Sequence, residues 1–164
     1  MTFVSHRKHL MTEFRVEAGP GAVFPLLCPV REYDWIPFWK CKLLYSVSGL
    51  AEKDCVFRTF FLHRGRELWT CYLHEPDERI GYLRLGGGRV SRLEVTLRPE
   101  RNHTSVSWVT TLTGITRRGN RFIEKMDQEE YEREIKALGA MLDRYVTTGA
   151  SMPKGEARHL FKHG

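Results

Sequence analysis

The sequence predicts an α+β fold, in which a sheet of about seven antiparallel strands is followed by one long helix. Apolar and polar residues alternate in short segments through the middle of the chain, and the separators between these segments are short and rich in turn formers. Such separators favour hairpins, because parallel strands need crossovers of about a dozen residues or more. Towards the end of the chain the apolar period changes from two residues to about 3.6, which is typical of a helix.

The first strand is expected at residues 10–18, where Phe14 and Val16 would share one face. The glycines and prolines that follow end this strand and allow a short helix over residues 21–27. The next segment, CPVREYDWIPFWKCK at residues 28–42, brings four aromatic residues together beside two prolines. Because proline interrupts helices, we expect a second short helix or an irregular loop there.

Six further strands follow, separated by GLAEKD, HRGR, EPDE, GGGR and PERN. The three consecutive glycines could suggest a phosphate-binding loop, but neither the Lys-Ser/Thr pair of such a loop nor a helix follows them. We therefore interpret them as a hairpin turn. The strands are expected at residues 42–49, 55–62, 66–76, 79–85, 91–99 and 104–114.

The long helix is expected to begin after Asp127 and to end near Thr148. Asp127 and Glu130 have the spacing of a capping box, and Gly149 suits the position after the last turn. About 20 residues give a length of about 30 Å, enough to cross a sheet. Gly139, within the helix, indicates either a close approach to a bulky sheet residue or room for a ligand. The apolar stripe of the helix consists of Tyr131, Ile135, Leu138, Leu142, Tyr145 and Val146.

The length of 164 residues fits one domain. We expect this domain over residues 10–149, after a flexible N-terminus at residues 1–9 and before a flexible basic tail at residues 150–164. No apolar run approaches the roughly 18 residues of a membrane span, and the N-terminal segment lacks the features of a secretory signal. A cytoplasmic protein is therefore expected.

The formal net charge is +6, but the basic residues are scattered and many flank turns. This distribution indicates a solvated basic surface rather than the continuous basic stripe of a nucleic-acid binder. Cys28, Cys41, Cys55 and Cys71 have no CxxC spacing and no closely spaced histidine. We therefore expect free thiols, no metal site and no cofactor.

The order of these elements resembles the SRPBCC superfamily, which joins the steroidogenic-regulator (START) lipid-transfer domains, the birch-pollen allergen and the polyketide cyclases. The resemblance covers residues 10–149 and looks closest to small bacterial polyketide-cyclase-like members. The segments that carry it are FRVEAGPGAVFPLL (14–27), EYDWIPFWKCKLLYSVSG (32–49), DCVFRTFF (54–61), ELWT (67–70) and EEYEREIKALGAMLDRYVTTG (129–149).

What the resemblance implies is a helix-grip fold. In this fold a curved antiparallel sheet surrounds the long C-terminal helix, with a deep apolar cavity between them. Two short helices after the first strand would close one end of that cavity. Trp35 and Trp39 would then lie at the cavity mouth as lid or wall residues. The alternative is that both rings simply plug the open end of the sheet.

Alternation along the strands predicts which side chains face inward. For residues 79–85 the alternation is ambiguous, because Ile80, Tyr82 and Arg84 compete with two leucines. An outward Arg84 at the strand end is favoured, since an inward Arg84 would need an anionic partner. The other inward residues are expected to be Phe57, Thr59, Trp69, Cys71, Leu93, Val95, Leu97, Val106, Trp108 and Thr110.

No catalytic residue can be assigned from the sequence. There is no G-x-S-x-G motif, and His74, at a strand end, is the one histidine placed to serve as a general base. Its neighbours suggest a solvated position at the rim of the sheet. Glu32 and Asp34 are the carboxylates nearest the expected mouth.

We therefore expect a monomeric or homodimeric protein that binds an apolar or aromatic small molecule, lipid- or polyketide-like, in the cavity. The alternatives are a cyclase- or dehydratase-type enzyme without a metal, and an interaction protein with a vestigial cavity whose basic surface engages an acidic partner. The expected ligand-binding residues are Trp35, Trp39, Tyr45, Phe57, Thr59, Trp69, Tyr82, Trp108, Thr110, Met126, Leu138 and Leu142.

Overall fold

One antiparallel sheet of seven strands, in the order β1-β7-β6-β5-β4-β3-β2, forms most of the protein. The computed structural model describes residues 2–61 and 64–163. The predicted α+β class and the antiparallel pairing are confirmed. The strands are β1 (Arg7–Val16), β2 (Cys41–Tyr45), β3 (Val56–Phe61), β4 (Gly65–Glu75), β5 (Arg79–Gly86), β6 (Arg89–Pro99) and β7 (Thr104–Gly114). The helices are α1 (Pro20–Val23), η1 (Phe24–Leu27), η2 (Glu32–Asp34), α2 (Arg117–Lys125), α3 (Gln128–Thr148) and α4 (Lys154–His163).

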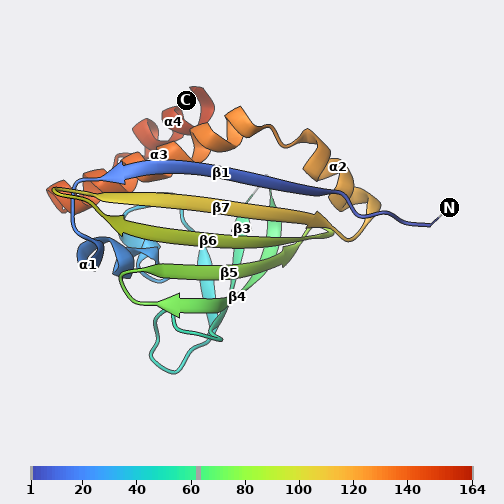
Figure 1. Ribbon diagram of the computed structural model, residues 1–164, viewed down its shortest axis with the longest axis horizontal. Coiled ribbons are helices and arrows are strands. Elements are labelled where there is room, and N and C mark those ends of the chain that lie inside the picture. Colours follow the sequence, from blue (N-terminus) through green and yellow to red (C-terminus); the bar gives the residue numbers. More distant parts are fainter. Residues whose placement is uncertain (1, 62–63, 164) are drawn as a thin grey trace.

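The sheet is strongly twisted, so that β3 runs steeply across the direction of β7 in Figure 1. The helices α3 and α4 lie beside β1, while α1 lies near the end of β1. The longest strands alternate strictly: in β7 every second residue is buried from Thr104 to Gly114. This alternation gives the sheet one inner face, towards α3, and one outer face.

The turn between β5 and β6 confirms the interpretation of the three glycines. Gly86 pairs with Arg89, which leaves Gly87 and Gly88 as a two-residue connection. Both have positive φ angles, 57° and 75°. A two-residue hairpin turn with positive φ at both positions favours glycine, because other residues are strained there.

Both ends of α3 lie where predicted, although within the described residues only the Asp127 half of the capping box forms. The side chain of Asp127 accepts a hydrogen bond from the backbone N–H of Glu130 at 3.2 Å. Gly149, in the left-handed conformation with φ 74°, donates its N–H to the carbonyl oxygen of Tyr145. These two contacts satisfy backbone groups that the helix itself leaves unpaired.

The glycine within α3 marks a close approach to the sheet. A Cβ atom added at Gly139 would lie 2.6 Å from the ring of Phe14, on β1. Of the two interpretations of Gly139, the close approach to a bulky sheet residue is therefore supported, and that residue is Phe14. This contact sets how closely α3 packs on β1.

The structure adds two helices that the sequence did not predict. Thr116 caps α2 by accepting a hydrogen bond from the N–H of Gly119 at 3.1 Å. Residues 154–163, expected within a flexible tail, instead form α4. Ala157 is fully buried, and Phe161 packs edge-on against Phe38 with ring centres 5.1 Å apart. The segment is a helix rather than a flexible tail because Ala157, Leu160 and Phe161 form a small apolar stripe that packs against the core.

The strand expected at residues 42–49 is shorter than predicted. β2 ends at Tyr45, and the carboxylate of Glu52 then accepts hydrogen bonds from the N–H groups of Val47 and Ser48. These bonds turn the chain away from the sheet. The first strand is longer than predicted. β1 begins at Arg7, within the N-terminal segment of residues 1–9 that was expected to be flexible. Within the described residues, no helix is long and apolar enough to cross a membrane.

Candidate functional site

The inner face of the sheet carries a cluster of packed aromatic rings. Phe57 and Trp69 stack with ring centres 5.1 Å apart, and the ring of Tyr82 packs edge-on against both. Trp39 reaches this cluster from the segment before β2, with its ring centre 6.4 Å from that of Trp69. The predicted inward direction of Phe57, Trp69 and Trp108 is confirmed by their burial.

The polar side-chain atoms of the aromatic cluster and its neighbours Thr59, Thr110 and Tyr131 have partners within the protein, whereas the buried hydroxyl of Thr12 on β1 has none among the described residues. Trp69 donates its indole N–H to the hydroxyl of Thr59 at 2.8 Å. Tyr82 donates its hydroxyl to the carbonyl oxygen of Leu27 at 3.0 Å, which ties β5 to η1. The hydroxyls of Thr110 and Tyr131 lie 2.8 Å apart and link β7 to α3. Buried polar groups usually require such partners, and here they fix the orientation of the aromatic rings.

The two tryptophans of the residue 28–42 segment have different environments. Trp35 is 1% exposed and donates its indole N–H to the carbonyl oxygen of Leu26. This arrangement fits the interpretation of Trp35 as a plug. Trp39 is half-buried and donates its indole N–H to the carbonyl oxygen of Pro29, and its ring centre lies 5.4 Å from that of Phe61 and 6.4 Å from that of Trp69. Only Trp39 therefore has the partial exposure expected of a lid residue.

Arg84 corrects the prediction for β5. Leu83 and Leu85 are 37% and 49% exposed, so they face outward and the side chain of Arg84 points inward. The anionic partner is Glu67 on β4, whose carboxylate accepts from Arg84 at 2.5 Å and from Arg89 at 2.8 Å. The alternation from Ile80 and Tyr82 therefore continues to the end of the strand, and the protein itself neutralises the buried charge.

This Arg84–Glu67–Arg89 triad is almost completely enclosed. The Glu67 side chain is 2% exposed, that of Arg89 4%, and that of Arg84 10%. Burial alone would raise the pKa of Glu67, but the attraction of Arg84 and the hydrogen bond from it outweigh burial, so that its pKa is lowered. Burial lowers the pKa of both arginines, and Glu67 opposes this effect. The triad carries one more positive than negative charge.

Two aromatic rings and one further ion pair surround the triad. The guanidinium carbon of Arg84 lies 4.1 Å from the ring centre of Trp69, and that of Arg89 lies 3.7 Å from the ring centre of Phe122 on α2. Arg64 donates to Glu134 of α3 at 2.9 Å. The triad thus lies at the end of the inner face where the sheet meets the helices.

Glu32, at the start of η2, differs from the other acidic residues that the structure describes because its pKa is strongly raised. Its backbone carbonyl accepts from Trp35 and Ile36, but within the described residues its carboxyl group makes no hydrogen bond and no ion pair. Burial raises its pKa to about 8, and the attraction of Arg84 opposes this only in part. Glu32 is half-buried, so a partner molecule can reach it. Burial raises the pKa of Tyr82, and the charge of Glu32 raises it further.

At neutral pH a carboxyl group with such a pKa is mainly protonated and can donate a hydrogen bond or a proton. The sequence identified Glu32 only as one of two carboxylates near the expected mouth. The other, Asp34, accepts from Arg31 at 2.6 Å in an ordinary surface pair. His74 packs edge-on against the ring of Phe24, with ring centres 5.2 Å apart.

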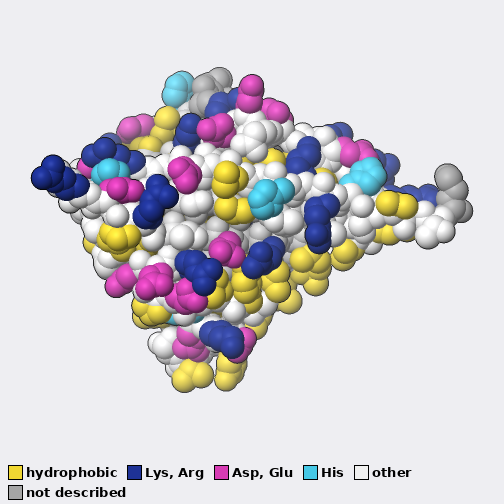
Figure 2. Space-filling view, in the orientation of Figure 1, with side chains coloured by type: hydrophobic (Ala, Val, Ile, Leu, Met, Phe, Trp, Pro, Cys, Tyr) yellow, Lys and Arg dark blue, Asp and Glu magenta, His cyan; other side chains and the backbone are white. Residues whose placement is uncertain are grey.

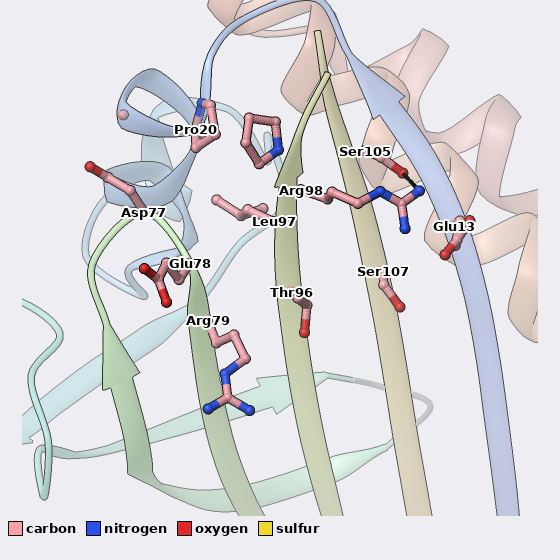
Figure 3. Close-up of a pocket in the computed structure, with 12 residues that line it drawn as sticks. Glu13, Pro20, Asp77, Glu78, Arg79, Thr96, Leu97, Arg98, Ser105 and Ser107 are labelled. Atoms are coloured by element: carbon pink, nitrogen blue, oxygen red, sulfur yellow. Dashed lines mark hydrogen bonds between the residues drawn. The ribbon is translucent and has the colours of Figure 1, made fainter. Parts of the chain in front are cut away.

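Two surface hollows can be described by volume. The larger, of about 690 Å³, lies on the outer side between α1 and the ends of β5 to β7. Figure 3 shows that Arg98 there is bonded to Ser105, and Arg79 is paired with Glu75, so both arginines of this hollow already have partners. The smaller, of about 320 Å³, lies over β2 to β4 and is lined mainly by basic residues. Neither hollow lies between the inner face and α3.

Comparisons with known proteins identify the architecture. No protein-family model matches the chain, and no curated protein matches it significantly. Among solved structures, norcoclaurine synthase from Thalictrum flavum, a point mutant in complex with a transition-state analogue, superimposes with a TM-score of 0.68 at 12% identity, covering 90% of this chain and 99% of that one. The fold is the helix-grip fold.

Two further solved structures are similar to this chain. A putative uncharacterised protein from Rhizobium leguminosarum gives a TM-score of 0.63 at 14% identity, with 88% of this chain and 97% of that chain covered. DynU16, a putative protein in the dynemicin biosynthetic locus, gives 0.58 at 16% identity, with 87% of this chain and 48% of that chain covered. At these identities the similarity shows the fold.

The predicted ligand-binding residues differ in how far they are exposed to solvent. Tyr45 is 62% exposed on the edge strand β2, where a register shift after Leu43 turns it outward, so its predicted place in the wall is wrong. Three residues are half-buried at the margin of the core and keep accessible surface: Trp39, Met126 and Leu138. The remaining eight are at most 8% exposed and pack within the core: Trp35, Phe57, Thr59, Trp69, Tyr82, Trp108, Thr110 and Leu142.

Proposed function

We propose that the protein binds a small apolar or aromatic molecule next to Glu32, at the half-buried margin where the inner aromatic face meets α3. The similar structures include an enzyme in complex with a transition-state analogue and a protein from a biosynthetic locus. Membership of the SRPBCC superfamily, in its polyketide-cyclase-like branch, is part of the same proposal. The half-buried side chains of Trp39, Met126 and Leu138 would form the apolar contacts.

The observation that carries this proposal is the unpartnered carboxyl group of Glu32. Glu32 is half-buried, and a carboxyl group that the surrounding protein shields in part from water gains from a hydrogen-bond partner. The nearby polar atoms of Thr59, Tyr82 and Trp69 are already engaged with other protein groups. A hydroxyl or amine on a bound aromatic molecule would supply the missing partner, so the preferred ligand has one polar group on an apolar ring.

A second candidate function is catalysis of a proton transfer on the same ligand, as in a cyclase- or dehydratase-type enzyme. A general acid works best when its pKa lies near the operating pH, and the pKa of Glu32 is raised to about 8. Glu32 would donate its proton to a leaving oxygen or receive one from an acidic C–H group. The positive charge of Arg84 would stabilise negative charge that develops on the ligand.

Binding is tested with naphthol and naphthalene as probes, followed by tryptophan fluorescence. The wild-type protein is expected to bind both, and naphthol about fivefold more tightly, because its hydroxyl can hydrogen-bond to Glu32. Glu32→Leu should remove the preference for naphthol, since its side chain can neither donate nor accept a hydrogen bond. Equal affinity for the two probes in wild type and variant would contradict a role for Glu32 in binding.

The location of the site is tested with a matched pair of substitutions. Leu138→Phe adds volume at the half-buried position on α3, whereas Met11→Phe adds it on the outer face of β1, where Met11 is 55% exposed. We expect Leu138→Phe to abolish probe binding and Met11→Phe to leave it unchanged. Native mass spectrometry of gently purified protein should also show a small bound species that Leu138→Phe loses. Binding by both variants alike would place the ligand elsewhere.

A further inference from the structure

The outer face of β2 to β4 carries four cationic side chains around the smaller hollow. We call Lys40, Lys42, Arg58 and Arg66 the basic face. They line the hollow of about 320 Å³ together with Cys41, Thr59 and Phe60, and no acidic residue takes part. Three of the four lie on different strands, so the sheet itself brings them together.

The strand register places like charges opposite each other. Lys42 of β2 pairs directly with Arg58 of β3. Like charges directly opposite on one face of an antiparallel pair are destabilising. Within the described part of the chain, none of the four cations of the basic face has an ion-pair partner. The fold therefore maintains an uncompensated positive potential at this place.

The other half of the outer face is different. Arg92 on β6 pairs with Glu94 at 3.1 Å, and Arg98 pairs with Glu100 at 3.0 Å. Arg79 on β5 contacts Glu75 and Glu94. The outward arginines of β5 and β6 are thus neutralised within the protein, whereas the cations of the basic face are not. This contrast indicates that the partner of the basic face is an anion from outside the protein.

Large apolar side chains accompany the cations of the basic face. Phe60 pairs with Arg66, and Leu68 lies opposite both Arg58 and Leu85 in the sheet. Phe60 is 50% exposed, Leu68 45% and Leu85 49%. Figure 2 shows hydrophobic side chains gathered along the lower margin of the molecule, over β5 and β4. Charged and apolar side chains therefore alternate on one continuous surface.

We propose that this surface docks onto a membrane that contains anionic lipids. The cations would contact lipid phosphates and carboxylates, while Phe60, Leu68 and Leu85 would enter the boundary between headgroups and acyl chains. A nucleic acid would complement the charge but would not use exposed aliphatic side chains. The proposal does not depend on the ligand of the inner face.

Vesicle flotation with the full-length chain tests this proposal. We expect binding to vesicles of phosphatidylcholine with phosphatidylserine, no binding to phosphatidylcholine alone, and release at high salt. Each cation near an anionic surface should contribute about fivefold to the partition coefficient, so the double variant Lys42→Ala/Arg58→Ala should lose about 25-fold. The matched control Arg92→Ala/Arg98→Ala removes the same formal charge from the ion-paired half and should change the partition coefficient much less.

The apolar contribution is tested by Leu68→Ser, with Met11→Ser on the outer face of β1 as its control. Leu68→Ser should weaken vesicle binding severalfold, and Met11→Ser should not. Absence of wild-type binding to the anionic vesicles would overturn the proposal, as would equal losses in the two double variants. Binding to polyglutamate or to a DNA oligonucleotide without binding to vesicles would replace the lipid surface by another anionic partner and also overturn it.

Discussion

The guanidinium group of Arg84 lies 4.1 Å from the ring centre of Trp69, and both side chains belong to the inner face of the sheet. This contact joins the aromatic cluster to the buried triad, because the same guanidinium donates to Glu67 at 2.5 Å. Arg84 also lowers the otherwise raised pKa of Glu32. One residue thus links the rigid end of the core with the group that we propose meets the ligand.

Glu67→Gln should strongly destabilise the protein. The substitution leaves the buried guanidinium groups of Arg84 and Arg89 without a counter-charge, and breaking a buried ion pair in this way costs about 3–5 kcal/mol. Urea unfolding followed by circular dichroism measures the loss. The surface pair of Arg98 and Glu100 provides the control, since Glu100→Gln should cost less than about 1 kcal/mol. Similar losses in both variants would show that the triad is not enclosed as described.

Glu32 should make the protein less stable as the pH rises. Its folded-state pKa, about 8, lies above the ordinary value of 4.5, so the folded protein holds the proton over a range in which the unfolded chain has lost it. Stability from this group is complete below about pH 4.5 and falls until about pH 8. Glu32→Gln removes the dependence. The difference in unfolding free energy between variant and wild type should therefore grow across this window, and a constant difference would contradict the raised pKa.

Gly139→Ala should destabilise the protein, although alanine is the better helix former by about 1 kcal/mol. The new methyl group would lie 2.6 Å from the Phe14 ring and push α3 away from β1. Gly155 in α4 is the matched control, because a Cβ atom there has nothing within 4 Å, and Gly155→Ala should be neutral or stabilising. Adding Phe14→Leu should recover part of the loss in Gly139→Ala. Thermal unfolding of the four proteins checks this.

The helix α4 should contribute to stability. Ala157 is fully buried, whereas Ala140 on α3 is exposed. Ala157→Glu would bury an unpaired carboxylate and should detach α4, which limited proteolysis would reveal as early cleavage after Gly149. Ala140→Glu introduces the same side chain in solvent and should leave the protease pattern unchanged. Equal protease sensitivity of wild type and Ala157→Glu would contradict a stably packed α4 and would favour the flexible tail expected from the sequence.

The strands and the long helix could be predicted because their signals are local. Alternation assigned Phe57, Trp69 and Trp108 to the inner face, and Asp127 and Gly149 marked the ends of α3. Arg84 was assigned wrongly because exposure is the default for arginine, and its partner Glu67 is recognised only when the register of β4 and β5 is known. The alternation of Ile80, Tyr82 and Arg84 indicates the correct, inward direction of Arg84, and in the structure it outweighs the usual exposure of arginine.

The part of the site around Glu32 could be predicted only coarsely. The carboxylate was recognised as lying near the expected mouth, but its raised pKa depends on the protein packed around η2, which no local pattern reveals. Tyr45 was predicted to face the cavity but is exposed. It alternates correctly with Leu43 in the sequence, yet the irregular register at the edge of the sheet exposes it.

The most direct test is the pKa of Glu32, measured by ¹³C NMR titration of the side-chain carboxyl groups, with Glu32→Gln to assign the signal. The account predicts a midpoint of about 8 in the free protein, and a shift of that midpoint when naphthol is bound. A midpoint near the ordinary value of 4.5, unaffected by naphthol, would contradict it.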